Sequence, residues 1–247
     1  MTAGRVVVRA RRQLALKFEA RAESGASVAD RIYAELKKAI VNGVFKPGTP
    51  IDKNEIRLRF KASLSPVTMA VNRLGYEQLV VIEPQRGSFV APIVRDDILQ
   101  LMSLRRALET EAIAEATRSR SKTLAAMLER NLIYQQASVK SSDIAGFYEL
   151  DVELHRLIIE ASGLRKFNEV LDEVRPHLDR VRLLMLPSPG RMEGTLAEHE
   201  AIVAAIASAN TRRAEGAMRD HLRRVREEFH TYAIAHPEMF FDAGAKA

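Results

Sequence analysis

Four ionisable residues occupy positions that helical spacing turns toward a core: Asp151, His155, His199 and His221. In FYELDVELHRLII, Asp151 and His155 are four residues apart, so they share one helix face with apolar neighbours. His199 and His221 lie among apolar residues in TLAEHEAIVAAI and MRDHLRRVREEF. A buried carboxylate and buried imidazoles are costly unless they are paired or bound to metal. The pattern therefore predicts a metal site between helices, with nitrogen and oxygen ligands.

The ligand types restrict the metal without fixing it. A single histidine on an apolar face is more often a hydrogen-bonded core residue, but four such residues favour a divalent ion. Imidazole ligands favour zinc, and nickel, manganese or iron also suit this set. The sequence shows no glutamate that obviously accompanies the site as a general base, so the pattern favours sensing over hydrolysis.

Arg105 is a candidate ligand-binding residue. In ILQLMSLRRALETEA it shares a stripe with Leu108, so we expect Arg105 to point inward and Arg106 to point outward. A buried guanidinium needs an anionic partner. That partner is either a structural carboxylate, such as Glu109 or Glu153, or a small carboxylate ligand held by the arginine and the metal together.

The composition limits the class of protein. The chain has 247 residues, 47% of them apolar, which suits one large domain or two modest ones. It has no cysteine, which excludes disulfides and thiolate ligands and fits a reducing compartment. No apolar stretch approaches the roughly 20 residues of a membrane span, and no secretory signal is visible. We therefore expect a cytoplasmic protein with no membrane partner.

The net charge of +6 is concentrated near the N-terminus. Lys and Arg outnumber Asp and Glu by 6 to 2 in residues 1–26 and by 11 to 6 in residues 27–95, whereas residues 96–247 hold 21 against 24. The excess positive charge suggests an anionic partner, most simply nucleic acid, although a solubilising surface would give the same count.

The first third is predicted to form a small domain behind a basic, mobile arm at residues 1–26. SVADRIYAELKKAIVNG is typical of a helix with Ser27 as its N-cap. Its apolar positions are Val28, Ile32, Leu36, Ala39 and Ile40. Further helices are expected over about 52–60 and from about 63 to 76.

Two β-rich runs follow, LVVIEP and GSFVAPI, and Gln85-Arg86-Gly87 joins them. This arrangement predicts a two-stranded hairpin. Three helices and such a wing, within residues 27–92, form a winged helix-turn-helix.

After a linker at about 92–97 the pattern is helical only. Helices are expected near 97–119, 122–139, 143–162, 164–186, 192–208 and 211–235. The predicted fold is therefore mainly α, with an N-terminal winged helix-turn-helix and a C-terminal antiparallel all-α bundle of six to seven helices over 97–236, followed by a tail at 237–247. We expect three methionines to fill gaps in the cores: Met69, Met102 and Met185.

The sequence is similar to a known family. VADRIYAELKKAIVNGVFKPGTPID resembles the opening of GntR-type DNA-binding domains, and GYEQLVVIEPQRGSFVAPI resembles their wing. RRALETEAI, DVELHRLI, LAEHEAIVAAI and MRDHL resemble the ligand-binding helical domain, FCD, of the FadR-like branch. This resemblance implies a bacterial, dimeric, ligand-responsive transcriptional regulator. It also places Asp151, His155, His199 and His221 at the metal-binding positions of the family.

The chain departs from the family at the DNA-reading turn. Where the family has a stretch like G-V-S-R-T-P-V-R-E-A-L, this chain reads KASLSPVTMAV. The two arginines that would contact DNA are therefore Leu64 and Thr68 here. Nearby positive charge could compensate, although lysine and arginine differ in geometry. The candidate DNA-binding residues are Arg57, Arg59, Lys61, Ser65, Thr68, Arg73, Arg86 and Gly87.

Together these features predict a repressor that binds a palindromic DNA operator as a homodimer and responds to a small organic acid at a divalent-metal site. Two alternatives stay open. One is a metal-dependent enzyme that uses the bundle site. The other is a regulator with degenerate DNA reading that acts as a ligand sink or heterodimer partner, which a salt-dependent mobility-shift assay would distinguish.

Overall fold

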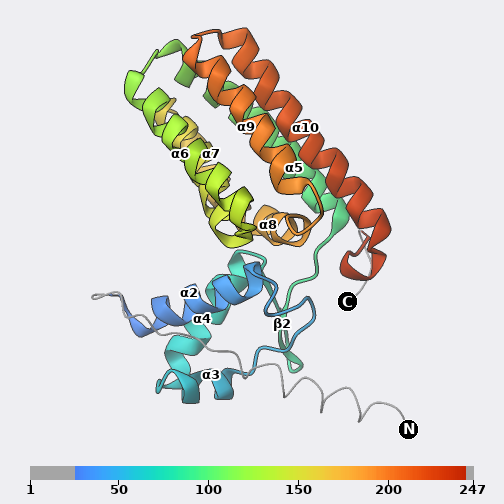
Figure 1. Ribbon diagram of the computed structural model, residues 1–247. Coiled ribbons are helices and arrows are strands. Elements are labelled where there is room, and N and C mark those ends of the chain that lie inside the picture. The colour runs from blue at the N-terminus through green and yellow to red at the C-terminus, as the bar shows by residue number, and fades with distance from the viewer. Residues whose placement is uncertain (1–25, 243–247) are drawn as a thin grey trace. The chain divides into compact units, whose positions relative to one another are not determined.

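The computed structural model describes residues 26–242, which divide into two compact units at Pro92 and Ile93 (Figure 1). The basic arm expected at residues 1–26 lies almost wholly outside the described residues. Within residues 26–242, no helix is long and apolar enough to cross a membrane.

The first unit contains the three predicted helices, α2 (Val28–Val41), α3 (Lys53–Arg59) and α4 (Leu64–Tyr76). Helix α2 begins after Ser27, whose hydroxyl accepts a hydrogen bond from the backbone N–H of Asp30, so Ser27 is the N-cap that the sequence predicts. Asp52 caps α3 by accepting hydrogen bonds from the backbone N–H groups of Asn54 and Glu55. These caps fix where each helix starts.

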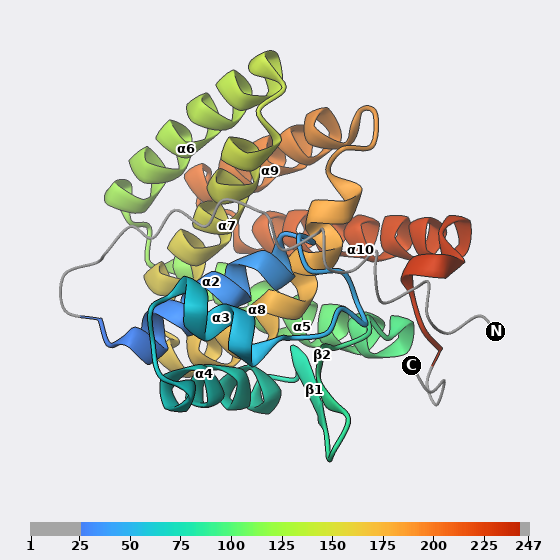
Figure 2. The same cartoon turned by 90° about the horizontal axis from the view of Figure 1, so that it is seen from below.

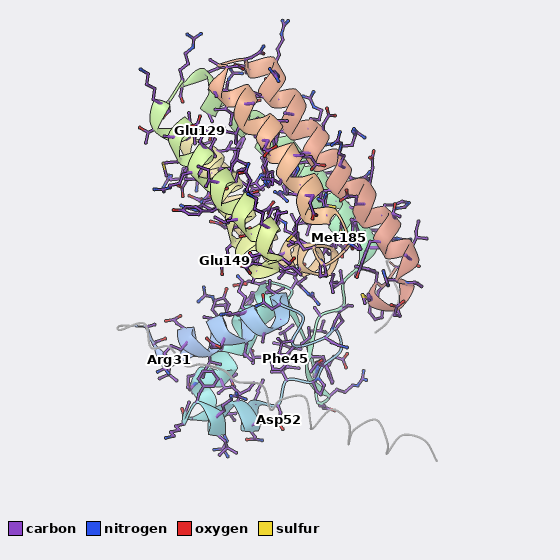
Figure 3. All side chains as sticks on the ribbon, in the orientation of Figure 1. Arg31, Phe45, Asp52, Glu129, Glu149 and Met185 are labelled. Carbon is purple, nitrogen blue, oxygen red and sulfur yellow. The ribbon has the colours of Figure 1, made fainter. Side chains whose placement is uncertain are left out.

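The three helices bury one apolar core. Its most buried members include Ile32, Leu36, Ile40, Phe45, Val67, Val71, Leu74 and Leu79. Phe45 belongs to the turn after α2 (Figure 3). The expectation that Met69 fills the core is wrong. Met69 is 62% exposed because the buried stripe of α4 runs through Val67, Val71 and Leu74 on the other side of the helix. Val28, at the first position of α2, is 43% exposed.

The predicted wing is present as β1 (Val80–Glu83) and β2 (Gly87–Val90), paired antiparallel with Val80 opposite Val90. The hairpin projects from the helices of its unit (Figure 2). Gly87 ends the connecting turn with φ +121°, a conformation that residues with a Cβ rarely adopt.

The second unit contains the predicted helical bundle. Its helices are α5 (Arg95–Arg118), α6 (Lys122–Ser141), α7 (Ile144–Ala161), α8 (Arg165–Met185), α9 (Arg191–Ala207) and α10 (Thr211–Ala235). Helix α10 contacts both α5 and α9 along its length, and α6 lies beside α7. Helix α8 is seen nearly end-on in Figure 1, where α9 and α10 run lengthwise, so it crosses them. Met102 and Met185 are buried in this unit, as predicted.

The residues after α10 belong to the bundle as far as they are described. The sequence predicts a tail at 237–247, but residues 237–242 fold back on the helices. A short 3-10 helix, η1 (Pro237–Met239), leads to Phe240, whose ring meets that of Phe229 edge to face at 5.4 Å between centroids. The backbone N–H of Phe241 donates a hydrogen bond to the carbonyl of Ile93. The two ends of the unit are therefore joined.

This contact predicts that the segment after α10 stabilises the bundle. Phe240→Ala removes a buried ring and leaves a cavity, so it should lower the free energy of unfolding of the helical unit by about 3 kcal/mol. Phe241→Ala is the matched control, because that side chain is less buried. Urea unfolding followed by circular dichroism measures both variants, and equal losses would contradict a specific role for Phe240.

Candidate metal centre and nucleic-acid interface

Four buried ionisable side chains meet in the interior of the helical unit. Helix α7 supplies Asp151 and His155, α9 supplies His199, and α10 supplies His221. Each is at most 4% exposed. One potential ligand atom from each lies within 4.8 Å of those from the other three. Residues up to 70 positions apart in the chain are thus brought together as the sequence analysis expected.

The three imidazoles turn the same ring nitrogen toward the centre. Nε2 of His199 lies 3.3 Å from Asp151 Oδ1, and Nε2 of His155 lies 3.9 Å from it. Among the described residues, none of the three histidine Nε2 atoms has a hydrogen-bond partner. A buried polar atom left without a partner costs roughly 1–3 kcal/mol. Three such nitrogens beside one carboxylate oxygen therefore fit a shared cation.

The opposite ring nitrogens face fixed acceptors. The Nδ1 contacts are 2.6 Å from His155 to Glu109, 2.8 Å from His199 to Gln135, and 2.7 Å from His221 to Glu198. Because the hydrogen-bond partners of His199 and His221 are oxygens that accept, Nδ1 is the protonated nitrogen in these two residues and Nε2 keeps its lone pair for a ligand. Such outer partners orient metal-binding histidines and increase their basicity.

The protonation states also suit a cation. Burial alone would raise the pKa of Asp151, but the ion pair between its Oδ2 and Arg182, together with smaller contributions from His155, His199 and Arg105, outweighs burial and holds the pKa well below its usual range. Burial lowers the pKa of His199 and of His221 well below the ordinary value, and the neighbouring imidazoles lower both further. At neutral pH the site therefore offers the Asp151 carboxylate and neutral imidazoles at His199 and His221, the forms that bind metal.

The amide of Gln135 is itself held in place. Its Nε2 donates to Oδ1 of Asn131 at 2.7 Å. Asn131 in turn donates to the carbonyl of Leu150 and to the carboxylate of Glu153, both at 3.0 Å. This chain of donors and acceptors fixes which end of Gln135 faces His199. The same chain of hydrogen bonds includes Glu153, the other carboxylate that the sequence offers as a partner for Arg105.

Arg105 points inward and forms an ion pair with Glu109 at 2.6 Å, whereas Arg106 is less buried. Glu109, one of the two carboxylates that the sequence offers as a structural partner for Arg105, is therefore its partner.

Arg105 also lines a cavity of about 30 Å³ next to Asp151 and His221. Other lining residues are Arg182, Arg191, Thr195 and Met185, the last of which lies at the end of α8 (Figure 3). This volume holds about one or two water molecules, so an organic acid would have to displace side chains.

Sequence reasoning missed several members of the site. Arg182 lies four residues after Leu178 and three before Met185, so its helical spacing could have indicated an inward side chain. Gln135 gave no such signal, since its role depends on a histidine 64 positions away. Glu198 adjoins His199 in sequence but contacts His221 instead.

The candidate DNA-binding residues all lie in the first unit. Arg57 and Arg59 belong to α3, Lys61 to the following turn, and Ser65 and Thr68 to the outer side of α4. On the wing, Arg86 is largely exposed beside Gly87 and forms an ion pair with Glu83 at 2.6 Å.

Arg73 differs from the other candidates because its guanidinium is engaged within the unit. It stacks on the ring of Tyr33, 3.6 Å from the centroid, and forms ion pairs with Asp30 and Glu77 at 3.4 and 3.6 Å. Its first role is therefore structural.

Comparison with known proteins relates both units to regulators. Residues 28–90 match the family of bacterial regulatory proteins called gntR, and residues 100–224 match the FCD domain. The HTH-type transcriptional repressor RspR of Escherichia coli K12 is 28% identical over 200 residues, covering 81% of this chain and 88% of the relative. The gluconate operon transcriptional repressor of Bacillus subtilis is 28% identical over 171 residues, covering 69% and 70%.

Solved structures share the fold. A GntR transcriptional regulator from Rhodococcus sp. RHA1 superposes with a TM-score of 0.72 at 22% identity, covering 83% of this chain and 99% of the other. McbR/YncC of E. coli superposes with a TM-score of 0.71 at 16% identity, covering 84% and 99%. With both domain matches in order along the chain, this protein belongs to the GntR family of DNA-binding transcriptional regulators, among the members that carry an FCD domain.

Proposed function

We propose that this regulator is a repressor whose helical unit binds a divalent metal through Asp151, His155, His199 and His221, and that a small carboxylate bound beside the metal changes its affinity for a palindromic operator. The observation that carries the proposal is the set of three inward Nε2 atoms without hydrogen-bond partners in the described chain. A metal ion would give all three a ligand bond at once and would neutralise Asp151.

The ligand set favours zinc among the divalent ions. Three imidazole nitrogens and one carboxylate oxygen match the donors and the coordination number that zinc prefers, and nickel, manganese or iron could also be held. When bound, the ion would supply a positive charge to which a carboxylate ligand can attach.

The adjoining arginines support a carboxylate effector. Arg105, Arg182 and Arg191 line the cavity, and each also forms an ion pair with a protein carboxylate. A guanidinium has five donor hydrogens, so one ion pair leaves donors for a ligand. Thr195 adds a hydroxyl to the same wall. A small organic acid is the ligand class that such a wall recognises.

Regulation of operator binding would follow from the fact that the site takes side chains from several helices. The four candidate ligands lie on α7, α9 and α10, and their oriented partners lie on α5, α6, α8 and α9. A ligand that favours one arrangement of these helices shifts the population between operator-binding and released dimers. Repression is supported by the names of RspR and of the gluconate operon repressor.

Metal removal tests the first part of the proposal. Protein purified without chelator should contain about one divalent ion per chain, and chelation should lower its melting temperature because the metal binds only the folded state. His199→Ala and His221→Ala should abolish uptake, whereas His230→Ala, at an exposed position, should not. Gln135→Leu should weaken affinity roughly 10–100-fold, and Gln136→Leu should leave it unchanged. Unaltered uptake in both His199→Ala and His221→Ala would contradict the site.

The depressed histidine pKa values predict how the metal-free protein responds to acid. Below the ordinary pKa of 6.5 the unfolded chain gains protons on His199 and His221 that the folded chain does not. The free energy of unfolding should therefore fall as the pH drops from 7 to 5. Asp151, whose pKa is lowered from 3.8, adds its own loss only in more acidic solution. Urea unfolding across this range should show a smaller fall for His221→Gln than for the matched surface variant His230→Gln.

The effector hypothesis predicts that small mono- or dicarboxylates raise the melting temperature of metal-loaded protein and release it from DNA, with little effect on metal-free protein. Arg105→Gln and Arg191→Gln should weaken this response, and Arg106→Gln should not. Thermal unfolding and mobility-shift titrations measure the two effects. Equal responses in all three variants would place the carboxylate elsewhere.

A further inference from the structure

We infer that the DNA-reading helix of this chain selects A·T base pairs, through thymine methyl groups and the adenine edge, rather than guanine. The inference rests on DNA binding by the helix-turn-helix unit and concerns which bases that unit prefers. The side chains on the outer face of α4 carry it.

The outer face of α4 is uncharged over most of its length. Val67, Val71 and Leu74 turn toward the core, and the opposite side of the helix is exposed or half-exposed. Its side chains include Leu64, Ser65, Thr68, Met69, Asn72, Arg73 and Tyr76. Within α4, which is described from end to end, Arg73 is the one charged residue.

The position of the apolar side chains matters more than their exposure alone. Leu64 is 50% exposed and Met69 is 62% exposed, and single exposed apolar residues are common on protein surfaces. These two, however, lie in the first two turns of the second helix of a helix-turn-helix. In that motif the N-terminal residues of the second helix contact base edges in the major groove. Leu64, Thr68 and Met69 therefore occupy reading positions.

Arg73 does not supply a guanine contact in this arrangement. Guanine is read by an arginine or lysine that donates to O6 and N7. The guanidinium of Arg73 is stacked on Tyr33 and paired with Asp30 and Glu77. Reading guanine would compete with these three partners for the guanidinium group.

The remaining side chains match the chemistry of A·T pairs. Thymine presents a methyl group in the major groove, which apolar side chains and the threonine methyl contact favourably. Adenine presents N6 and N7, which asparagine can bind with two hydrogen bonds. Leu64, Thr68 and Met69 suit the first partner, and Asn72 suits the second.

Flanking charge identifies the occupant of this face as DNA rather than a second copy of the chain. Lys53 and Arg57 lie on α3, Lys61 lies in the turn before α4, and Arg86 lies on the wing. Such cations contact phosphates and fix the register without reading sequence. An uncharged face on the second helix, with cations on the preceding helix, the turn and the wing of the same unit, suits a major groove with its phosphate rims.

Selection from random duplexes, followed by base replacement, tests the inference. The full-length protein should select half-sites with thymine and adenine at the positions that α4 reaches. Uracil in place of thymine removes only the methyl group, and each contacted methyl lost should weaken binding about fourfold. The same number of uracils placed outside the half-sites should leave affinity unchanged. Replacing adenine by 7-deazaadenine should weaken binding in the wild type but not in Asn72→Ala.

Variants of α4 test whether its side chains cause the loss of affinity for DNA that contains uracil. In Leu64→Ala and Met69→Ala the penalty for uracil should shrink, because the side chain that contacts the methyl is gone. Tyr76→Ala, at the far end of the same face, should keep the full penalty. Leu64→Arg with Thr68→Arg should move the preference toward guanine. All these side chains are exposed or half-exposed, so the variants should fold, and circular dichroism checks this.

The outcomes separate this inference from DNA reading itself. If guanine is selected at the contacted positions, or if uracil has no effect, the inference is overturned while sequence-specific binding stands. If no duplex is preferred at any salt concentration, both are overturned. If the alanine variants change the sedimentation of the protein and leave DNA affinity unchanged, the face is a contact between copies and the inference is overturned.

Discussion

Three buried imidazoles on three different helices constrain the helical unit more than any other feature. Each must present one nitrogen to a fixed acceptor, because a buried polar atom without a partner is costly. Glu109, Gln135 and Glu198 provide those acceptors, and every remaining nitrogen then points to the same centre. The arrangement gives the interior the polar groups that the proposed cation needs in place of an apolar core, and it sets how closely α7, α9 and α10 can approach.

The same constraint links structure to regulation. The acceptors come from α5, α6 and α9, and α8 contributes Arg182 to the carboxylate that faces the imidazoles. A movement of the four central side chains therefore affects the positions of all the helices of the bundle, because none of these helices can move without breaking a buried polar contact. The small volume of the adjoining cavity strengthens this link. The proposed carboxylate would have to displace side chains, and that displacement would be the differential interaction that a regulator needs.

Local patterns in the sequence were sufficient to predict the helices, the wing and the burial of the four ionisable residues. Asp151 and His155 could be placed on one face because their spacing lies within a single helix. The spacing of Arg182 indicates an inward side chain but not its pairing with Asp151, and Gln135 gave no signal at all, because both roles depend on which helices become neighbours, and periodicity does not specify this. Met69 is a different case. Its exposure follows from the stripe through Val67 and Leu74, and the error came from treating an apolar residue type as evidence of burial.

Helix α4 shows why two proteins with the same helix-turn-helix fold can differ in the DNA bases that they select. The buried stripe of α4 determines how the helix packs on α2 and α3, whereas its outer face determines which bases it can contact. The two sets of residues do not overlap. Leu64 and Thr68, where the family pattern has arginines, are therefore compatible with an intact helix-turn-helix, and they lack the donors that guanine requires. The operator of a relative that keeps those arginines cannot be transferred to this chain, because function is determined by the site and not by the fold that carries it.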